Sequence, residues 1–139
     1  MDCPFCNIDK ERNKVIKYGK NVFVMFSNPR LMEGHLLVVP KRHVEKLSEL
    51  NEEERKELFD IVIEYQEKIL DNIAEGCDIR QNYRPFQKQD DLKVDHLHIH
   101  LQPRKFEDEL YQKSQIFEKD VFKELTEEEI NKIRSKLID

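Results

Sequence analysis

The chain lacks several features that would place it in common classes of protein. None of its apolar runs approaches the ~20 residues of a membrane-spanning helix, and its first residues begin no secretory signal. It has no excess of positive charge, with 24 Lys and Arg against 29 Asp and Glu, and so lacks the electrostatic footprint of a nucleic-acid-binding protein. Its three cysteines, an odd number, fit a reducing compartment. We therefore expect a cytoplasmic protein that binds neither membranes nor nucleic acids.

What the chain does contain is a row of histidines. Three of its five histidines alternate with aliphatic residues in His96-Leu97-His98-Ile99-His100-Leu101-Gln102. Side chains alternate across a strand, so an extended segment would present the imidazoles on one face and bury the aliphatic residues. His96 and His100 would stand roughly 13 Å apart, too far to share one metal ion that holds nitrogen ligands at about 2 Å. We expect the three rings to have different roles. The roles open to an imidazole are metal ligand, general acid or base, and nucleophile. The alternative is a hydrogen-bonded filler on a half-buried strand.

The other two histidines bound a second apolar segment. They stand near the two ends of Gly34-His35-Leu36-Leu37-Val38-Val39-Pro40-Lys41-Arg42-His43. The run 36–39 is typical of a buried strand, which Pro40 would end because proline cannot donate to a continuing ladder. A preceding extended run, 22–26, ends at Ser27-Asn28-Pro29, and we expect it to pair with this strand.

The N-terminus carries a candidate metal site. Cys3-Pro4-Phe5-Cys6 has the two-residue gap of a zinc knuckle and lacks the preceding strand that a redox motif requires. A closed site needs four ligands, and Cys77 stands alone. Two histidines would most simply complete a Cys2His2 zinc site. Two buried or idle thiols are the alternative.

Two helices are predicted by their caps and periodicity. The first begins after Asn51, which can form a capping box with Glu54. The second begins after Thr126, with Glu129 three residues on. The apolar stripe of the first helix is expected to form part of the core; it consists of Leu58, Ile61, Val62, Tyr65, Ile69 and Ile73.

Together, the three motifs resemble the histidine triad (HIT) family of nucleotide hydrolases and transferases. The likeness covers roughly residues 1–104 and keeps the family's motif order. It implies an α+β fold of two layers, with an antiparallel sheet, one long helix and a C-terminal helix. We expect a single domain over 1–139, in which 105–139 are a C-terminal extension; the charged residues 105–125 could wrap a partner subunit or border the site. The resemblance also implies a homodimer and a nucleotide substrate.

The resemblance implies a role for each histidine. His98 corresponds to the family's nucleophile, which attacks the α-phosphorus and holds a nucleotidyl group until water resolves it. His100 and His35 correspond to residues that flank the transferring phosphoryl group. In zinc-binding branches the zinc is structural and does not touch substrate. Its ligands there correspond to Cys3, Cys6, His43 and His96.

Five residues are expected to bind substrate, although they depart in part from the family's pattern. A ribose-binding Asn or Asp of many members is replaced by Ser27, with Asn28 beside it. Lys93 stands where nucleotide-binding members often carry a hydroxyl residue, and it could pair with a phosphate or remain in solvent. Asn82 resembles an asparagine that reaches the substrate phosphate, and Gln102 lies on the histidine face by alternation.

These inferences predict a nucleoside-phosphate hydrolase acting through a nucleotidyl-histidine, on dinucleoside polyphosphates or nucleoside phosphoramidates. The family's uridylyltransferases replace the third histidine by Gln, so the presence of His100 favours hydrolysis over obligate transfer. Three alternatives stay open. They are a dinucleoside polyphosphate phosphorylase or nucleotidyltransferase, a non-catalytic nucleotide-binding module, and a metallohydrolase whose histidine row holds a catalytic zinc.

Overall fold

The structure is a computed structural model that describes residues 2–138. It divides into two compact units, with the boundary between Phe106 and Glu107. The first unit contains all the histidines and cysteines of the chain. The second contains only helices and the segments that connect them.

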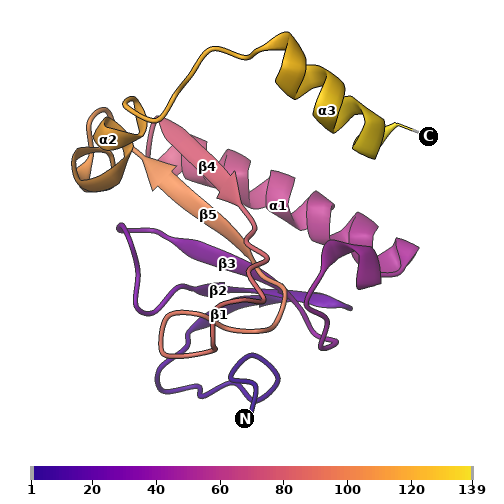
Figure 1. The fold of residues 1–139 in the computed structure, drawn as a ribbon. Helices are drawn as coiled ribbons and strands as arrows, with labels where there is room; N and C mark the ends of the chain where they lie inside the picture. Colours follow the sequence, from indigo (N-terminus) through magenta and orange to yellow (C-terminus); the bar gives the residue numbers. More distant parts are fainter. Residues whose placement is uncertain (1, 139) are drawn as a thin grey trace. The chain divides into compact units, whose positions relative to one another are not determined.

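The first unit is built on one antiparallel sheet. The strand order is β1-β2-β3-β5-β4, and α1 lies along one face of this sheet (Figure 1). The α+β fold predicted from the sequence is therefore confirmed. The elements of this unit are β1 (Val15–Tyr18), β2 (Val22–Phe26), β3 (Leu36–Pro40), a 3-10 turn (Leu47–Glu49), α1 (Glu52–Asn72), β4 (Gly76–Arg80) and β5 (Ile99–Arg104).

The predicted pairing of the two apolar strands is confirmed. β2 runs antiparallel to β3, with Val24 opposite Val38 and Phe23 opposite Val39. Because side chains alternate, the first pair belongs to the core cluster that includes the residues of α1, and the second pair belongs to a cluster on the other face. Phe5 of the N-terminal segment packs in this second cluster. The sheet is thus covered on both faces in the region of the candidate site.

The start of α1 follows the prediction. The Asn51 side chain accepts a hydrogen bond from the Glu54 amide at 2.8 Å, and the Glu54 carboxylate accepts one from the Asn51 amide at 2.9 Å. Glu54 is buried and also pairs with Arg42 at 2.8 Å, which fixes the segment after β3 to the helix. The far end differs from the prediction: Ile73 caps the C-terminus and is 46% exposed, because the chain leaves the helix there to enter β4.

The histidine triplet differs from the predicted strand in one respect. Its aliphatic residues are buried in the core on the α1 side, as alternation predicts. However, β5 begins only at Ile99, so His96 and His98 precede the ladder. The pairing with β3 ends where Val38 lies opposite Ile99, and the Leu97 amide donates instead to the Val44 carbonyl at 2.7 Å.

The second unit is helical. A π-helical turn (Tyr111–Gln115) runs into a short α2 (Ile116–Glu118), and α3 spans Glu127–Leu137. The predicted cap of α3 is confirmed, since the Thr126 hydroxyl accepts a hydrogen bond from the Glu129 amide at 3.2 Å. Within 127–137, no side chain is buried.

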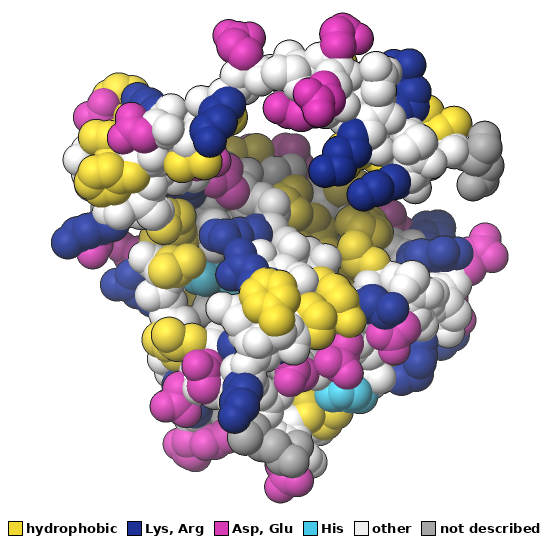
Figure 2. Space-filling model, in the orientation of Figure 1, with side chains coloured by type: hydrophobic (Ala, Val, Ile, Leu, Met, Phe, Trp, Pro, Cys, Tyr) yellow, Lys and Arg dark blue, Asp and Glu magenta, His cyan; other side chains and the backbone are white. Residues whose placement is uncertain are grey.

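The described part of the chain, residues 2–138, contains no helix that is both long and apolar enough to cross a membrane. On the face drawn in Figure 2, Lys and Arg side chains are interspersed with Asp and Glu. This distribution agrees with the near balance of acidic and basic residues in the sequence.

Candidate active site and metal cluster

Two cysteines and two histidines from distant parts of the chain meet at one point. The ligand atoms of Cys3, Cys6, His43 and His96 all lie within 4.8 Å of one another. Cys3 Sγ is 3.3 Å from His96 Nδ1, and Cys6 Sγ is 3.3 Å from His43 Nδ1. A tetrahedral zinc ion with bonds of about 2.3 Å to sulfur and 2.0 Å to nitrogen requires neighbouring donors about 3.5 Å apart. These four residues could therefore hold one metal ion.

A backbone carbonyl orients His96 for this role. The ring Nε2 donates to the Pro40 carbonyl at 2.8 Å. A carbonyl can only accept, so Nε2 carries the proton and Nδ1 presents its lone pair to the cluster. The ring is 2% exposed. Pro40 thus ends β3 and also fixes the tautomer of a potential ligand.

The other two histidines of the triplet are not part of the cluster. Among residues 2–138, this is the single group of three or more side chains placed to hold a metal. His98 and His100 lie outside it. This separation agrees with the sequence argument that one extended segment cannot bring all three rings to one ion.

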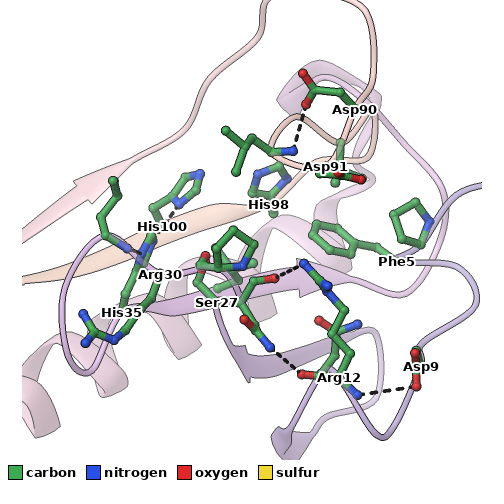
Figure 3. A pocket seen from close by; sticks show the side chains of 18 of the residues that line it. Phe5, Asp9, Arg12, Ser27, Arg30, His35, Asp90, Asp91, His98 and His100 are labelled. Carbon is green, nitrogen blue, oxygen red and sulfur yellow. Dashed lines mark hydrogen bonds between the residues drawn. The ribbon is translucent and has the colours of Figure 1, made fainter.

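A cavity of about 610 Å³ lies beside the cluster, on the sheet face opposite α1. Three histidines line it: His98, His100 and His35 (Figure 3). Its other walls come from the N-terminal segment, the turn 27–31, Leu37 of β3 and the loop residues 90–92 and 94. Its volume falls in the range of small-molecule sites.

The hydrogen bonding of His98 leaves one ring nitrogen available in the cavity. Nδ1 donates to the His96 carbonyl at 2.7 Å, so the neutral ring keeps a lone pair on Nε2. The Phe5 ring and this ring form a T-shaped pair, with centroids 5.2 Å apart and planes at 90°. Burial lowers the pKa of His98 and favours the neutral form, although the bond to His96 opposes this shift.

His35 and His100 form a directed pair. The Leu31 amide donates to His35 Nδ1 at 3.1 Å, so a neutral His35 carries its proton on Nε2, which donates to His100 Nδ1 at 2.9 Å. A neutral His100 therefore keeps its own proton on Nε2. Burial, with a further contribution from the neighbouring His98, lowers the pKa of His35 to about 4 and that of His100 to about 3.

The structure places two of the predicted substrate-binding residues in the cavity. Ser27 and Asn28 both line it. The Ser27 hydroxyl donates to the Pro29 carbonyl at 2.8 Å, and the Asn28 side-chain amide donates to the Arg12 carbonyl at 3.1 Å. The first bond lies within the turn 27–31, and the second holds this turn against the N-terminal segment.

The other three predicted substrate-binding residues do not line this cavity. Asn82 and Lys93 border a separate hollow of about 30 Å³. Lys93 Nζ donates to the Gln87 carbonyl at 2.6 Å and pairs with Asp95, so its charge is held within its own loop. Gln102 is 2% exposed and belongs to the buried interior.

The cavity also contains residues that the sequence did not single out. Arg12 and Arg30 line it, but both stand in irregular segments without periodicity or motif. Asp90 and Asp91 contribute from a loop whose course no pattern predicted. The position of Phe5 could have been inferred from the sequence, because it lies between two cysteines that could ligate a metal and is therefore placed wherever those cysteines are.

Comparisons with known proteins identify the family of the chain. The family model of the HIT domain matches residues 9–107. The chain therefore belongs to the HIT domain family, as its motifs predicted.

Individual relatives are more distant. The chain is 29% identical, over 107 residues and 75% of each protein, to a Schizosaccharomyces pombe protein named adenosine 5'-monophosphoramidase hnt1. Its fold is similar to that of a HIT family protein from Bacillus anthracis, with a TM-score of 0.71, 24% identity, and coverage of 98% of this chain and 94% of the other. A Zn-bound histidine triad family protein from Mycobacterium smegmatis has a TM-score of 0.66 and 26% identity, with coverage of 79% and 80%.

The low pKa values of His35 and His100 predict a specific pH response. Both lie below the 6.5 of an ordinary histidine, so the unfolded chain binds more protons than the folded one at pH below about 6.5. The contribution of these two residues to the free energy of unfolding is therefore fully present above pH 6.5. It falls as the pH is lowered toward their folded pKa values.

Ring ¹H–¹⁵N spectra of the histidines test this. We expect both residues to remain neutral at pH 5, with His35 carrying its proton on Nε2. A titration midpoint near 6.5 for either ring would contradict the hydrogen-bonded pair.

Proposed function

We propose that the protein hydrolyses nucleoside phosphates whose α-phosphorus bears a second group, through a covalent nucleotidyl intermediate on His98. The supporting observation is the hydrogen bond from His98 Nδ1 to the His96 carbonyl at 2.7 Å. It leaves the Nε2 lone pair as the nucleophile within a cavity of suitable size.

The first step is displacement at phosphorus. His98 Nε2 forms a bond to the α-phosphorus, the bond to the leaving group breaks, and the leaving group keeps the electron pair; an amine leaving group also takes a proton from water. The substituted ring is an imidazolium. Its Nδ1–H remains bonded to the His96 carbonyl, whose partial negative charge stabilises the new positive charge.

The paired histidines would stabilise the phosphoryl oxygens. His100 keeps a proton on Nε2, since Nδ1 accepts from His35, and that N–H is free to donate to a phosphoryl oxygen. The pair is held before substrate arrives, which lowers the cost of organising donors during the reaction. His35 acts through His100 in this scheme and is a positioning residue.

The second step is hydrolysis. A water oxygen bonds to phosphorus, the phosphorus–nitrogen bond breaks, and its electron pair returns to Nε2. The water loses a proton to solvent, and a nucleoside monophosphate leaves. A phosphorylase or nucleotidyltransferase would differ only in replacing water by phosphate or another acceptor.

A metallohydrolase is less well supported than this scheme. In the described residues, the potential metal ligands form a group of four donors, and His98 is not among them. A catalytic zinc usually keeps an open position beside three protein ligands. The four-donor set instead favours a structural role.

Intact-mass measurement tests the covalent step. The protein is mixed with adenosine 5'-phosphoramidate or diadenosine tetraphosphate and quenched in base, where phosphohistidine bonds survive better than in acid. We expect a fraction of the wild type to gain one adenylate, and His98→Ala to gain none and to lose about 10³-fold or more of the activity. Circular dichroism and metal content verify that the variant is folded.

Each outcome of this experiment selects one function. Turnover without an adduct, with His98→Ala still active, would refute the covalent mechanism. Binding of nucleotide without turnover would identify a non-catalytic module. Release of a nucleoside diphosphate when inorganic phosphate is added would identify a phosphorylase.

We also propose that the cluster of Cys3, Cys6, His43 and His96 holds a structural zinc ion. Both thiolate sulfur and imidazole nitrogen suit zinc, and the donor spacing fits a tetrahedral ion. When bound, the ion would fix the N-terminal segment against the start of β5. That segment supplies Phe5 to the cavity wall, so the metal would support the site without touching substrate.

Cysteine variants test the zinc site with a matched control. Cys6→Ser is expected to lose the stoichiometric zinc measured by plasma mass spectrometry and to lower the melting temperature. Cys77→Ser is the control, because Cys77 lies outside the cluster, and it should retain one zinc per chain. Equal zinc content in the two variants would contradict this assignment.

We further propose that the protein is a homodimer. The outer strands β1 and β4 each pair on one side only, and such edges are common places for strand addition from a second chain. Light scattering on the purified protein should give twice the 16.8 kDa of one chain. A monomeric mass at micromolar concentration would contradict the proposal.

A further inference from the structure

Arg80 lies beside the histidine row but has no role in the scheme above. It is the last residue of β4 and lies directly opposite His100 of β5. Directly opposed residues of an antiparallel pair project on the same face of the sheet, with Cβ atoms about 5 Å apart. The long side chain of Arg80 therefore starts next to the ring of His100. Its positive charge also contributes to the low pKa of His100, after burial, His98 and His35.

The charge of Arg80 has no acidic partner among residues 2–138. Asp78, on the same strand and the same face, pairs with Arg104 at 2.6 Å. No ion pair or hydrogen bond within residues 2–138 involves the Arg80 side chain, which is exposed. A free guanidinium beside two neutral imidazoles is a suitable partner for an anion, and its planar donors match a phosphate group well.

The order of the strands indicates which part of a substrate this anion belongs to. His100 lies between Leu37 of β3 on one side and Arg80 of β4 on the other. The cavity includes Leu37 and the segments near β3, but no residue of β4. A nucleoside in the cavity would place its α-phosphate at His98 and His100. In-line displacement places the leaving group opposite His98 Nε2. Because the nucleoside occupies the cavity on the β3 side of His100, the β4 side, where Arg80 stands, is left for the leaving group.

We propose that Arg80 binds a phosphate of the leaving group, so that the preferred substrates are nucleotides with a polyphosphate leaving group, such as dinucleoside polyphosphates. This inference rests on the proposed function, and it names the substrate class of the same site. Attack by His98 breaks a phosphoanhydride bond, and the departing polyphosphate carries away the electron pair and its negative charge. A neutral amine leaving group would make no such contact.

A comparison of two substrates tests the role of Arg80. The kcat/KM values for diadenosine tetraphosphate and adenosine 5'-phosphoramidate are measured for the wild type, Arg80→Ala, Arg80→Lys and Arg55→Ala. Arg55 is an exposed arginine on α1, on the other side of the sheet, and serves as the matched control. Inhibition by AMP, which has the nucleoside and α-phosphate but no leaving group, is measured in parallel.

We expect Arg80→Ala to lose roughly 10- to 100-fold in kcat/KM for the tetraphosphate, with partial rescue in Arg80→Lys. Its kcat/KM for the phosphoramidate and its AMP inhibition constant should change by less than about twofold, as should all values for Arg55→Ala.

The contrary results separate this inference from the function on which it rests. An equal loss on both substrates, or no loss on the tetraphosphate, overturns the role of Arg80. A wild type that consumes the phosphoramidate but no polyphosphate overturns it too and leaves the proposed function standing. A wild type that consumes neither overturns the proposed function and this inference together.

Discussion

The arrangement of the site depends on the hydrogen bonds and contacts of a single residue, His96. Its ring Nε2 donates to the Pro40 carbonyl, its Nδ1 lies against the thiols of Cys3 and Cys6, and its own carbonyl accepts from His98. These contacts join the end of β3, the N-terminal segment and the start of β5. A displacement of His96 would therefore move the cavity wall and the proposed nucleophile at once. This gives a physical reason for the proposed structural metal ion: it would fix the residue on which the orientation of His98 depends.

Backbone groups, and not acidic side chains, set the protonation pattern of the histidines. A carbonyl must accept and an amide must donate, so the His96 carbonyl and the Leu31 amide determine which nitrogen of His98 and of His35 carries the proton. The assignment passes from His35 to His100 through their shared hydrogen bond. The result is one lone pair, on His98, and one free N–H, on His100. Because these hydrogen bonds lie within the chain itself, the lone pair and the N–H are in place before a ligand arrives.

The sequence predicted those parts of the site that follow from strict periodicity or from short motifs. Alternation indicated that the three histidines could not share one ion, and the cap at Asn51 located the start of α1. The sequence could not show where β5 begins, because that depends on where its pairing with β3 ends. It did not indicate Arg80 either, since a lone arginine in a strand becomes informative only when the register places it opposite His100. Asn82 and Lys93 were expected to bind substrate, but both border a separate hollow, and Lys93 bonds to the Gln87 carbonyl and pairs with Asp95 of its own loop.

The charge of the site follows from the same packing. Burial keeps His35 and His100 neutral, with pKa values of about 4 and 3, so the histidine row supplies hydrogen bonds but little positive charge at neutral pH. A nucleotide substrate brings several negative charges, which need compensation in a partly desolvated cavity. The nearby cations are at the periphery: Arg12 and Arg30 line the cavity, and Arg80 stands beyond His100. In the proposed mechanism, neutral imidazoles leave the nucleophile unprotonated, while the outer arginines would bind the anion. A cationic histidine at the centre of the site could not both bind the anion and act as the nucleophile, because protonation would remove the lone pair on which the chemistry depends.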